Sequence, residues 1–181
     1  MKLQDIPKLI PEGDYEIAIG LKYLESTLKD YEEDYGLELN PDFQRGHVWS
    51  EEQQIAYVEF FLKGGKTAKT IYFSCPYFKN GTYEEYLSGK YDYPMVCVDG
   101  LQRLTALRKF LNNELKIFGH YLNEYEDKDI FLRRINSLRF NINDLPKKKD
   151  VLKWYLEMNT GGTPHSKEEI NRVTNMLNNT K

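Results

Sequence analysis

Hydrophobic side chains recur along this chain at spacings that predict several amphipathic helices. Over residues 21–35, apolar or aromatic residues return every three or four positions, so one face of a helix is apolar. Gly36 follows at once and is a suitable helix end. The same spacing predicts helices over residues 50–63 and 101–112, and a proline at its start favours another over residues 146–158.

Two predicted helix starts carry a capping box, in which a serine is followed three residues later by Gln or Glu. Ser50 with Gln53 is one, and Ser166 with Glu169 is the other, which places a last helix after residue 166. In this motif the serine hydroxyl and the later side chain each satisfy a backbone N–H group that the helix itself leaves unpaired.

Short runs that are rich in β-forming residues, or that alternate in polarity, predict strands. These runs are residues 70–75, 95–98, 115–118 and 138–142. Residues 76–94 contain turn-forming proline, Asn-Gly and glycine, and we expect a hairpin or an irregular insertion there.

The resulting fold class is α/β (α+β), with a small mixed sheet and surrounding helices in a single domain. We expect an irregular lead-in over residues 1–19, the domain over residues 20–177 and a frayed tail over residues 178–181.

Composition narrows the class of protein. Of 181 residues, 40% are hydrophobic, and 14 Tyr and 9 Phe need a core that buries them, which excludes disorder for most of the chain. No apolar run approaches the ~18–20 residues of a membrane span, and the amino terminus has no signal-peptide pattern, so no membrane partner is expected.

The cysteine content and the net charge further restrict the location and the binding mode that we expect. Cys75 and Cys97 cannot form a disulfide framework, which indicates reduced thiols in the cytoplasm. The net charge of −3 excludes nucleic-acid binding through bulk charge, while it leaves a local basic patch open.

The segment Val98-Asp-Gly-Leu-Gln-Arg103 joins a predicted buried strand to a predicted helix. Its glycine turn exposes backbone N–H groups at the positive end of the helix dipole, and Arg103 adds a planar fork of donors. Such a loop suits an anion, and phosphate is the expected occupant. The alternative is that Arg103 pairs with Asp99 and that Gly100 only makes the turn.

A second segment, residues 41–50, is called the Gln-Arg loop below after its residues Gln44 and Arg45. Arg45 is suited to phosphate, and an aromatic ring such as Trp49 to the face of a base, with His47 close by. The alternative places Trp49 and the loop's phenylalanine in the core and leaves the histidine with a structural role.

A third segment, Asn159-Thr-Gly-Gly-Thr-Pro, separates the last two predicted helices. Gly161 and Gly162 would let the backbone approach a ligand closely, but spacing alone favours a plain helix–helix connection. The three histidines are isolated and lack paired-ligand spacing, so no metal site is predicted.

Taken together and in this order, the three segments resemble the amino-terminal domain of GmrSD-type, modification-dependent restriction systems. That family is marked by an Asp-Gly-Gln-Gln-Arg motif on a ParB/sulfiredoxin-like fold. Residues 98–107 resemble its strand–turn–helix, residues 41–50 its Pro-x-Phe/Tyr-Gln-Arg motif, and residues 155–169 its Asn-Thr-Gly-Gly motif. The resemblance covers about residues 20–175.

The resemblance implies a domain that binds nucleotide or nucleic-acid phosphate, related to a sensor of modified DNA that hydrolyses NTP. NTP with Mg²⁺ is the implied ligand, and DNA and a His-Asn-His nuclease or defence complex are the implied partners. The residues carried over are Asp99, Gln102 and Arg103 for catalysis; Gln44, Arg45, Gly100, Asn159, Thr160, Gly161 and Gly162 for nucleotide or phosphate binding; and His47, Trp49 and Glu169 near the base or behind these residues.

The chain departs from the family pattern in ways that favour binding over turnover. Leu101 replaces the first Gln of the marker motif, Glu157 stands where many members have Arg, and His165 stands where Leu is usual. Because the chain ends soon after the third motif, we expect a stand-alone domain without the nuclease. A weak NTPase activity stays open.

Three alternatives remain. A non-enzymatic phage or host interaction protein would use the tyrosine-rich segment, residues 83–93, as a partner surface, unless these tyrosines pack on their own core. A nuclease would need Asp99, Glu168 and Glu169 to converge on a metal, which ranks lowest. A sulfiredoxin-type reductase would need a reactive thiol, and Cys97 is expected to be buried and inert.

Overall fold

The computed structural model describes residues 2, 5–44, 46, 48–134, 137–160 and 167–180. Within these residues the chain forms an α+β fold around one mixed sheet, as its sequence predicts. The strands are β1 (Tyr15–Gly20), β2 (Thr70–Ser74), β3 (Val96–Asp99) and β4 (Ser137–Asn143), in the spatial order β1-β4-β2-β3. β4 pairs antiparallel with β1 and parallel with β2, and β2 pairs antiparallel with β3.

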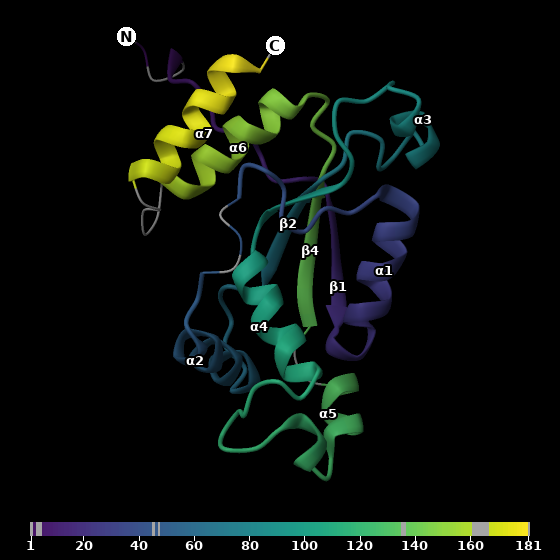
Figure 1. Ribbon diagram of the computed structural model, residues 1–181, viewed down its shortest axis with the longest axis vertical. Helices are drawn as coiled ribbons and strands as arrows, with labels where there is room; N and C mark the ends of the chain where they lie inside the picture. The colour runs from purple at the N-terminus through teal and green to yellow at the C-terminus, as the bar shows by residue number, and fades with distance from the viewer. Residues whose placement is uncertain are drawn as a thin grey trace.

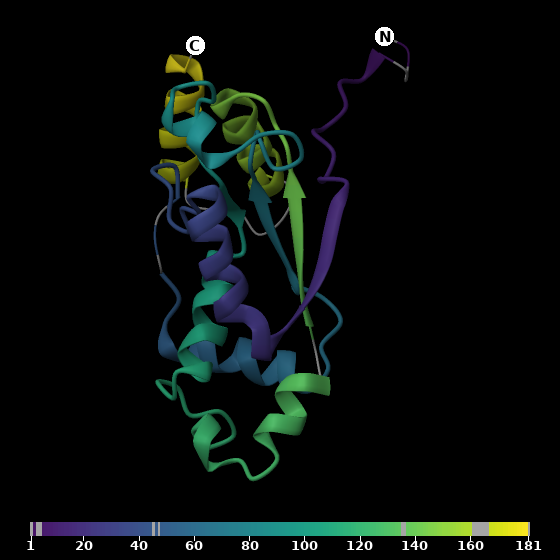
Figure 2. The same ribbon diagram turned by 90° about the vertical axis from the view of Figure 1, so that its right-hand side faces the viewer.

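Helices lie on both faces of this sheet (Figures 1 and 2). Helices α1 and α4 cover one face, and α6 packs against part of the other, beside α7. The helical segments are η2 (Leu21–Tyr23), α1 (Leu24–Tyr35), α2 (Glu51–Leu62), α3 (Tyr83–Leu87), α4 (Leu101–Leu111), η3 (Leu122–Glu124), α5 (Lys128–Arg134), α6 (Lys148–Thr160) and α7 (Lys167–Asn179).

The two faces have separate apolar clusters. Phe73 and Phe140 project from β2 and β4 toward α1 and α4, with ring centroids 4.9 Å apart. On the opposite face, Val98 packs with Trp154 and Tyr155 of α6. The sheet therefore separates a main core from a smaller one, and the smaller core includes the start of the third sequence motif.

Several predicted helix boundaries are confirmed. Gly36 ends α1 with φ of +61°, and Ser50 begins α2 with a complete capping box to Gln53. The helix predicted over residues 101–112 is α4, which begins after Gly100. Local sequence fixes these points because the capping bonds form within a few residues of chain.

Other expectations are wrong. The lead-in is not irregular up to residue 19, because residues 15–20 form β1 and pair along β4. Residues 115–118 form no strand, only an isolated bridge between Ile117 and His120. Leu115 and Ile117 are both buried, so their apolar pattern reflects core packing. Residues 76–94 contain the short helix α3, and α7 continues through Asn179 into the predicted tail.

Candidate functional site

The strand β3 contains an irregularity just before the glycine turn into α4. Tyr72 of β2 faces Asp99, while the next residue, Phe73, faces Cys97, so Val98 is an extra residue on β3. A bulge of this kind changes the direction of the side chains that follow it. It places Asp99 on the same side of the sheet as Tyr72, away from the core side where Cys97 lies.

Gly100 makes the turn that follows. Its φ is +104°, a backbone conformation that side chains disfavour, and it is the N-cap residue of α4. A Cβ atom here would lie 2.6 Å from the Ile71 Cδ1 atom. Glycine is therefore required both by the backbone angle and by the close approach to β2.

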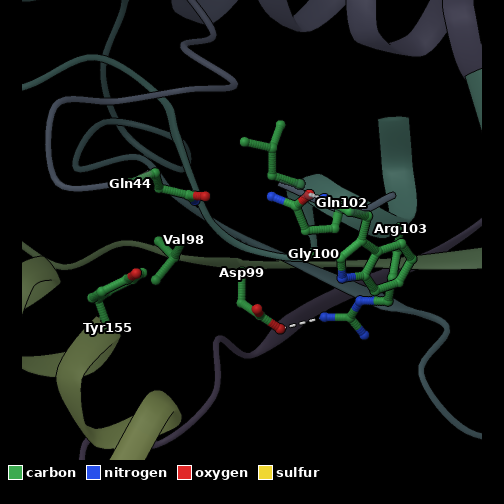
Figure 3. Close-up of a pocket in the computed structure, with 9 residues that line it drawn as sticks. Gln44, Val98, Asp99, Gly100, Gln102, Arg103 and Tyr155 are labelled. Carbon is green, nitrogen blue, oxygen red and sulfur yellow. Dashed lines mark hydrogen bonds and ion pairs between the residues drawn. The ribbon is translucent and has the colours of Figure 1, made fainter. Parts of the chain in front are cut away.

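A cavity of about 170 Å³ opens at this turn (Figure 3). Its walls come from the Gln-Arg loop, the end of β3, the first turn of α4 and the middle of α6. The lining residues are Gln44, Trp49, Val98, Asp99, Gly100, Leu101, Gln102, Arg103 and Tyr155. The first two sequence motifs thus meet in one place with Tyr155, which lies at the start of the third.

Arg103 and Asp99 form an ion pair across the first turn of α4, and Figure 3 shows the two side chains pointing toward one another. This is the contact that the alternative interpretation of the loop expected. The Arg103 side chain is only 15% exposed, whereas that of Asp99 is 36% exposed. The guanidinium is thus a largely buried charge, and it pairs with a carboxylate at the cavity wall.

Gln102, which the family resemblance implies is catalytic, bonds the backbone of the Gln-Arg loop. Its Oε1 atom accepts hydrogen bonds from the N–H groups of Val48 at 2.9 Å and Trp49 at 3.1 Å. Its Nε2 atom donates to the Gly46 carbonyl at 2.6 Å. Both ends of the amide therefore hold the Gln-Arg loop against α4.

Gln44 lies at the other wall of the cavity and donates from Nε2 to the Cys97 carbonyl at 2.6 Å. The backbone around it is held by Arg172 of α7, which donates to the carbonyls of Asp42 and Phe43, each at 2.7 Å. Sequence reasoning missed Arg172, since nothing local to α7 links it to residues about 130 positions away.

The two aromatic residues of the Gln-Arg loop lie in different environments. Phe43 is 1% exposed and belongs to the smaller core, as the structural alternative expected. Trp49 is half-buried, lines the cavity, and packs edge-on against Tyr57 at 5.5 Å between ring centroids. Burial raises the pKa of Tyr57 to about 12, so this phenol is neutral at physiological pH.

Tyr155 lines the cavity, although the sequence analysis did not include it among the site residues. Its ring packs against Phe43, with 5.3 Å between centroids, and its hydroxyl donates to Glu169 at 2.6 Å. Glu169, predicted behind the site, is buried and accepts this bond behind the cavity wall. Asn159 lies one turn further along α6, where its side chain donates to the Tyr155 carbonyl at 2.7 Å. Asn159 is not among the residues that line the cavity.

Several predicted site residues lie outside the described part of the chain. These are Arg45, His47, Gly161 and Gly162, together with the side chain of Thr160. Among the described residues, no group of three or more His, Cys, Asp or Glu could hold a metal ion. Cys97 is fully buried, and burial raises the pKa of its thiol, which leaves it unreactive as expected.

The tyrosine-rich segment, residues 83–93, packs on the protein itself. The Tyr83 and Tyr86 rings stack with centroids 5.8 Å apart, and Tyr77 lies 5.1 Å from Tyr91. Tyr83 also occupies the space where a side chain on Gly36 would lie. The rings are partly buried against the main core, which is the alternative to a partner surface.

Comparison with protein families gives a match to the model described as "GmrSD restriction endonuclease, N-terminal domain", over residues 24–176. The match spans the Gln-Arg loop, β3, α4 and α6, so it contains every described wall of the cavity. Comparisons with curated proteins and with solved structures found no match. In the described part of the chain, no helix is both long and apolar enough to cross a membrane.

Proposed function

This chain belongs to the GmrSD restriction endonuclease N-terminal domain family, and from that premise we propose that its cavity binds the phosphates of a nucleoside triphosphate. The membership makes it a domain of restriction-system type. The observation that carries the proposal is the convergence of Arg103 and the start of α4 on one cavity.

The start of α4 supplies the fixed part of the phosphate site. The first N–H groups of a helix have no partner within the helix, and the helix dipole adds positive potential there. The N-cap residue, Gly100, has no side chain to occupy these donors, and no side-chain cap bond is formed. A phosphate that enters beside Gly100 would meet these N–H groups together with the Arg103 guanidinium.

Asp99 is suited to bind a Mg²⁺ ion that arrives with the nucleotide. It is the one carboxylate among the described residues that line the cavity. Mg²⁺ is commonly held by one or two carboxylates together with substrate phosphates and water. The single carboxylate fits a metal that arrives with the nucleotide, and an Asp99 that turns toward Mg²⁺ would release Arg103 to the phosphates.

The remaining walls suit the rest of a nucleotide. Trp49 and Tyr155 present aromatic groups at the cavity, which suit contact with a sugar or base. Gln44 and Gln102 hold the Gln-Arg loop in place through backbone bonds. We also propose that the fold is ParB/sulfiredoxin-like, as the family resemblance implies.

We propose binding without fast turnover. Because both ends of the Gln102 amide are engaged by the backbone of the Gln-Arg loop, this side chain is not available to orient an attacking water. Leu101, where the family marker has Gln, is 8% exposed and packs with the main core. The proposed role is therefore a nucleotide-responsive element of a restriction system.

Calorimetric titration with each of the four NTPs in the presence of Mg²⁺ tests this proposal. Arg103→Ala should weaken binding by about tenfold or more, because a charge-assisted contact is worth roughly 1.5–3 kcal/mol. Arg108→Ala is the matched control, since Arg108 lies in the last turn of the same helix and pairs with Glu25.

Equal NTP affinity of wild type and Arg103→Ala would refute the phosphate site. A phosphate-release assay on the same samples separates the two forms of the proposal. No release above background is expected, whereas steady release by wild type would show that the site hydrolyses NTP.

A further inference from the structure

The hydrogen-bonding groups of the cavity are distributed unevenly between its sides. Figure 3 shows Gln44 and Tyr155 on one side, and Gln102 and Arg103 on the other. The side with Arg103 is rich in donors, because the guanidinium and the first N–H groups of α4 belong to it. The groups on the side of Gln44 and Tyr155 decide which part of a nucleotide can lie there.

The Gln44 side chain offers an acceptor to a ligand. Its amide nitrogen can only donate a hydrogen bond, and its amide oxygen can only accept one. Nε2 donates to the Cys97 carbonyl at 2.6 Å, and a carbonyl can only accept, so this bond fixes which end of the amide faces the strand. The Oε1 atom has no hydrogen-bond partner within the described part of the chain. Because Gln44 lines the cavity, Oε1 is the group that a ligand can use.

A second contact keeps the Gln44 nitrogen turned away from a ligand. Burial raises the pKa of the Cys97 thiol, and a hydrogen bond from the Gln44 side chain acts against this rise. The same amide nitrogen therefore faces both the carbonyl and the thiol of Cys97. Since the donors of Gln44 are directed to this buried residue, Gln44 is poorly suited to hold a phosphate, whose oxygens are acceptors.

Tyr155, on the same side, supplies a ring and no donor. A phenol has a single proton, and that of Tyr155 is directed to Glu169 at 2.6 Å. The ring is held by edge-on packing against Phe43, with 5.3 Å between centroids. This side of the cavity thus combines an amide oxygen with a fixed aromatic ring, which suits a group that has both hydroxyl donors and an apolar face.

The ribose is the part of a nucleotide that meets this description and lies within reach. Gln44 bonds to Cys97, which precedes Gly100 by three residues and so lies at most about 10 Å of chain from it. When phosphates lie at the start of α4, the sugar is the next part of the nucleotide. A base amine is also a donor, but it lies beyond the sugar and differs among the four bases.

We propose that the cavity selects ribonucleoside triphosphates, because Gln44 Oε1 accepts a hydrogen bond from a ribose hydroxyl. This inference rests on the phosphate site proposed above, and it adds the sugar and the orientation of the nucleotide. It also changes the role of Gln44 from the phosphate contact that the family resemblance implies to a sugar contact. A nucleotide without these hydroxyls would cover Oε1 and leave it unpaired, which sites of this kind disfavour.

Calorimetric titration with Mg²⁺ present, comparing the NTP that binds most tightly with its 2′,3′-dideoxy analogue, tests the proposal. Wild type should bind the NTP about tenfold more tightly than the analogue. In Gln44→Leu the two ligands should bind equally well, because leucine is of similar size and has no acceptor. The ratio of the two affinities is the decisive quantity, since a purely structural role of Gln44 would weaken both ligands together and leave the ratio unchanged.

The matched control is Gln102→Leu, which makes the same substitution in the same cavity. Both ends of the Gln102 amide are bonded to the backbone of the Gln-Arg loop, so this variant should keep the wild-type ratio even if both ligands bind more weakly. Thermal melting verifies that each variant is folded. A ratio that Gln44→Leu retains, or that both variants lose, would overturn the role of Gln44.

Arg103→Ala separates this inference from the function proposed for the cavity. It should weaken the NTP and the dideoxy analogue by the same factor, because both carry the same phosphates. If wild type bound the two ligands equally while Arg103→Ala weakened both, the phosphate site would stand and the sugar contact would be ruled out.

Two further outcomes would also count against the sugar contact. If wild type bound no NTP, the proposed function would fail and the sugar contact with it. A preference among the four bases that Gln44→Leu removes, without a difference between the NTP and its analogue, would place the base at Gln44 instead of the sugar.

Discussion

The cavity at the start of α4 and the tyrosine-rich segment were both candidate functional regions in the sequence, but their side chains make different kinds of contact. At the cavity, polar side chains are held by backbone atoms from distant segments, as Gln102 is by Gly46 and Val48. In the tyrosine-rich segment, the rings contact one another, as in the stack of Tyr83 on Tyr86. The cavity is surrounded by polar contacts between segments distant in sequence, whereas the tyrosine rings pack against one another and the main core.

This difference shows why residue type alone is a poor guide to function here. Aromatic residues are enriched at interfaces, but they are also the largest contributors to cores. The cavity is identified by polar groups that converge on a hollow from several elements, which no composition count detects. The following predictions test whether the two regions differ in this way.

The largest difference is expected from glycine substitutions. Gly100→Ala adds a Cβ atom 2.6 Å from Ile71 at a φ of +104°, so strain and overpacking should together cost about 3 kcal/mol of unfolding free energy. Gly89→Ala, next to the tyrosine-rich helix α3, has a similar φ of +87° but open space around it. It should cost only about 1 kcal/mol. Urea unfolding measures both, and equal costs would contradict the close packing at the turn.

A smaller difference is expected for the two glutamines that bond the backbone. Gln102→Ala leaves the N–H groups of Val48 and Trp49 and the Gly46 carbonyl without their partner, and should cost about 2 kcal/mol. Gln53→Ala removes one arm of an exposed capping box and should cost about 0.5–1 kcal/mol.

Hydrogen exchange makes the Gln102 prediction specific. Exchange of the Val48 and Trp49 amides should accelerate in Gln102→Ala and stay unchanged in Gln53→Ala, because only the first variant releases the Gln-Arg loop. Unchanged protection in both variants would mean that the loop is held by other contacts.

The smallest difference is expected from removing single tyrosine hydroxyls. Tyr155→Phe loses the buried bond to Glu169 and should cost about 1–2 kcal/mol. The Tyr83 hydroxyl makes no hydrogen bond within the described residues, so Tyr83→Phe should change stability by less than about 0.5 kcal/mol. Thermal melting compares the two variants, and the reverse order would contradict the contrast between the regions.

Much of the fold follows from local sequence signals. The Ser50 capping box, the Gly36 helix end and the helical spacing of α1, α2 and α4 were all readable, because their bonds and contacts are local in sequence. The second predicted capping box begins at Ser166, which lies outside the described residues. β1 was missed although Tyr15, Ile17 and Ile19 alternate. A strand at a sheet edge depends on its pairing partner, and β4 lies more than 100 residues further along the chain.

In the candidate site, too, some features follow from local sequence and others depend on tertiary contacts. By itself, the sequence determined that Asp99, Gly100, Gln102 and Arg103 lie on a strand–turn–helix, because a glycine at positive φ and a following amphipathic run fix that geometry locally. Only the tertiary structure decided what each side chain does there. The extra residue Val98 redirects Asp99, the Gln-Arg loop engages Gln102, and α6 and α7 supply Tyr155 and Arg172. These contacts join segments far apart in the chain, and their energies depend on packing that no local pattern encodes.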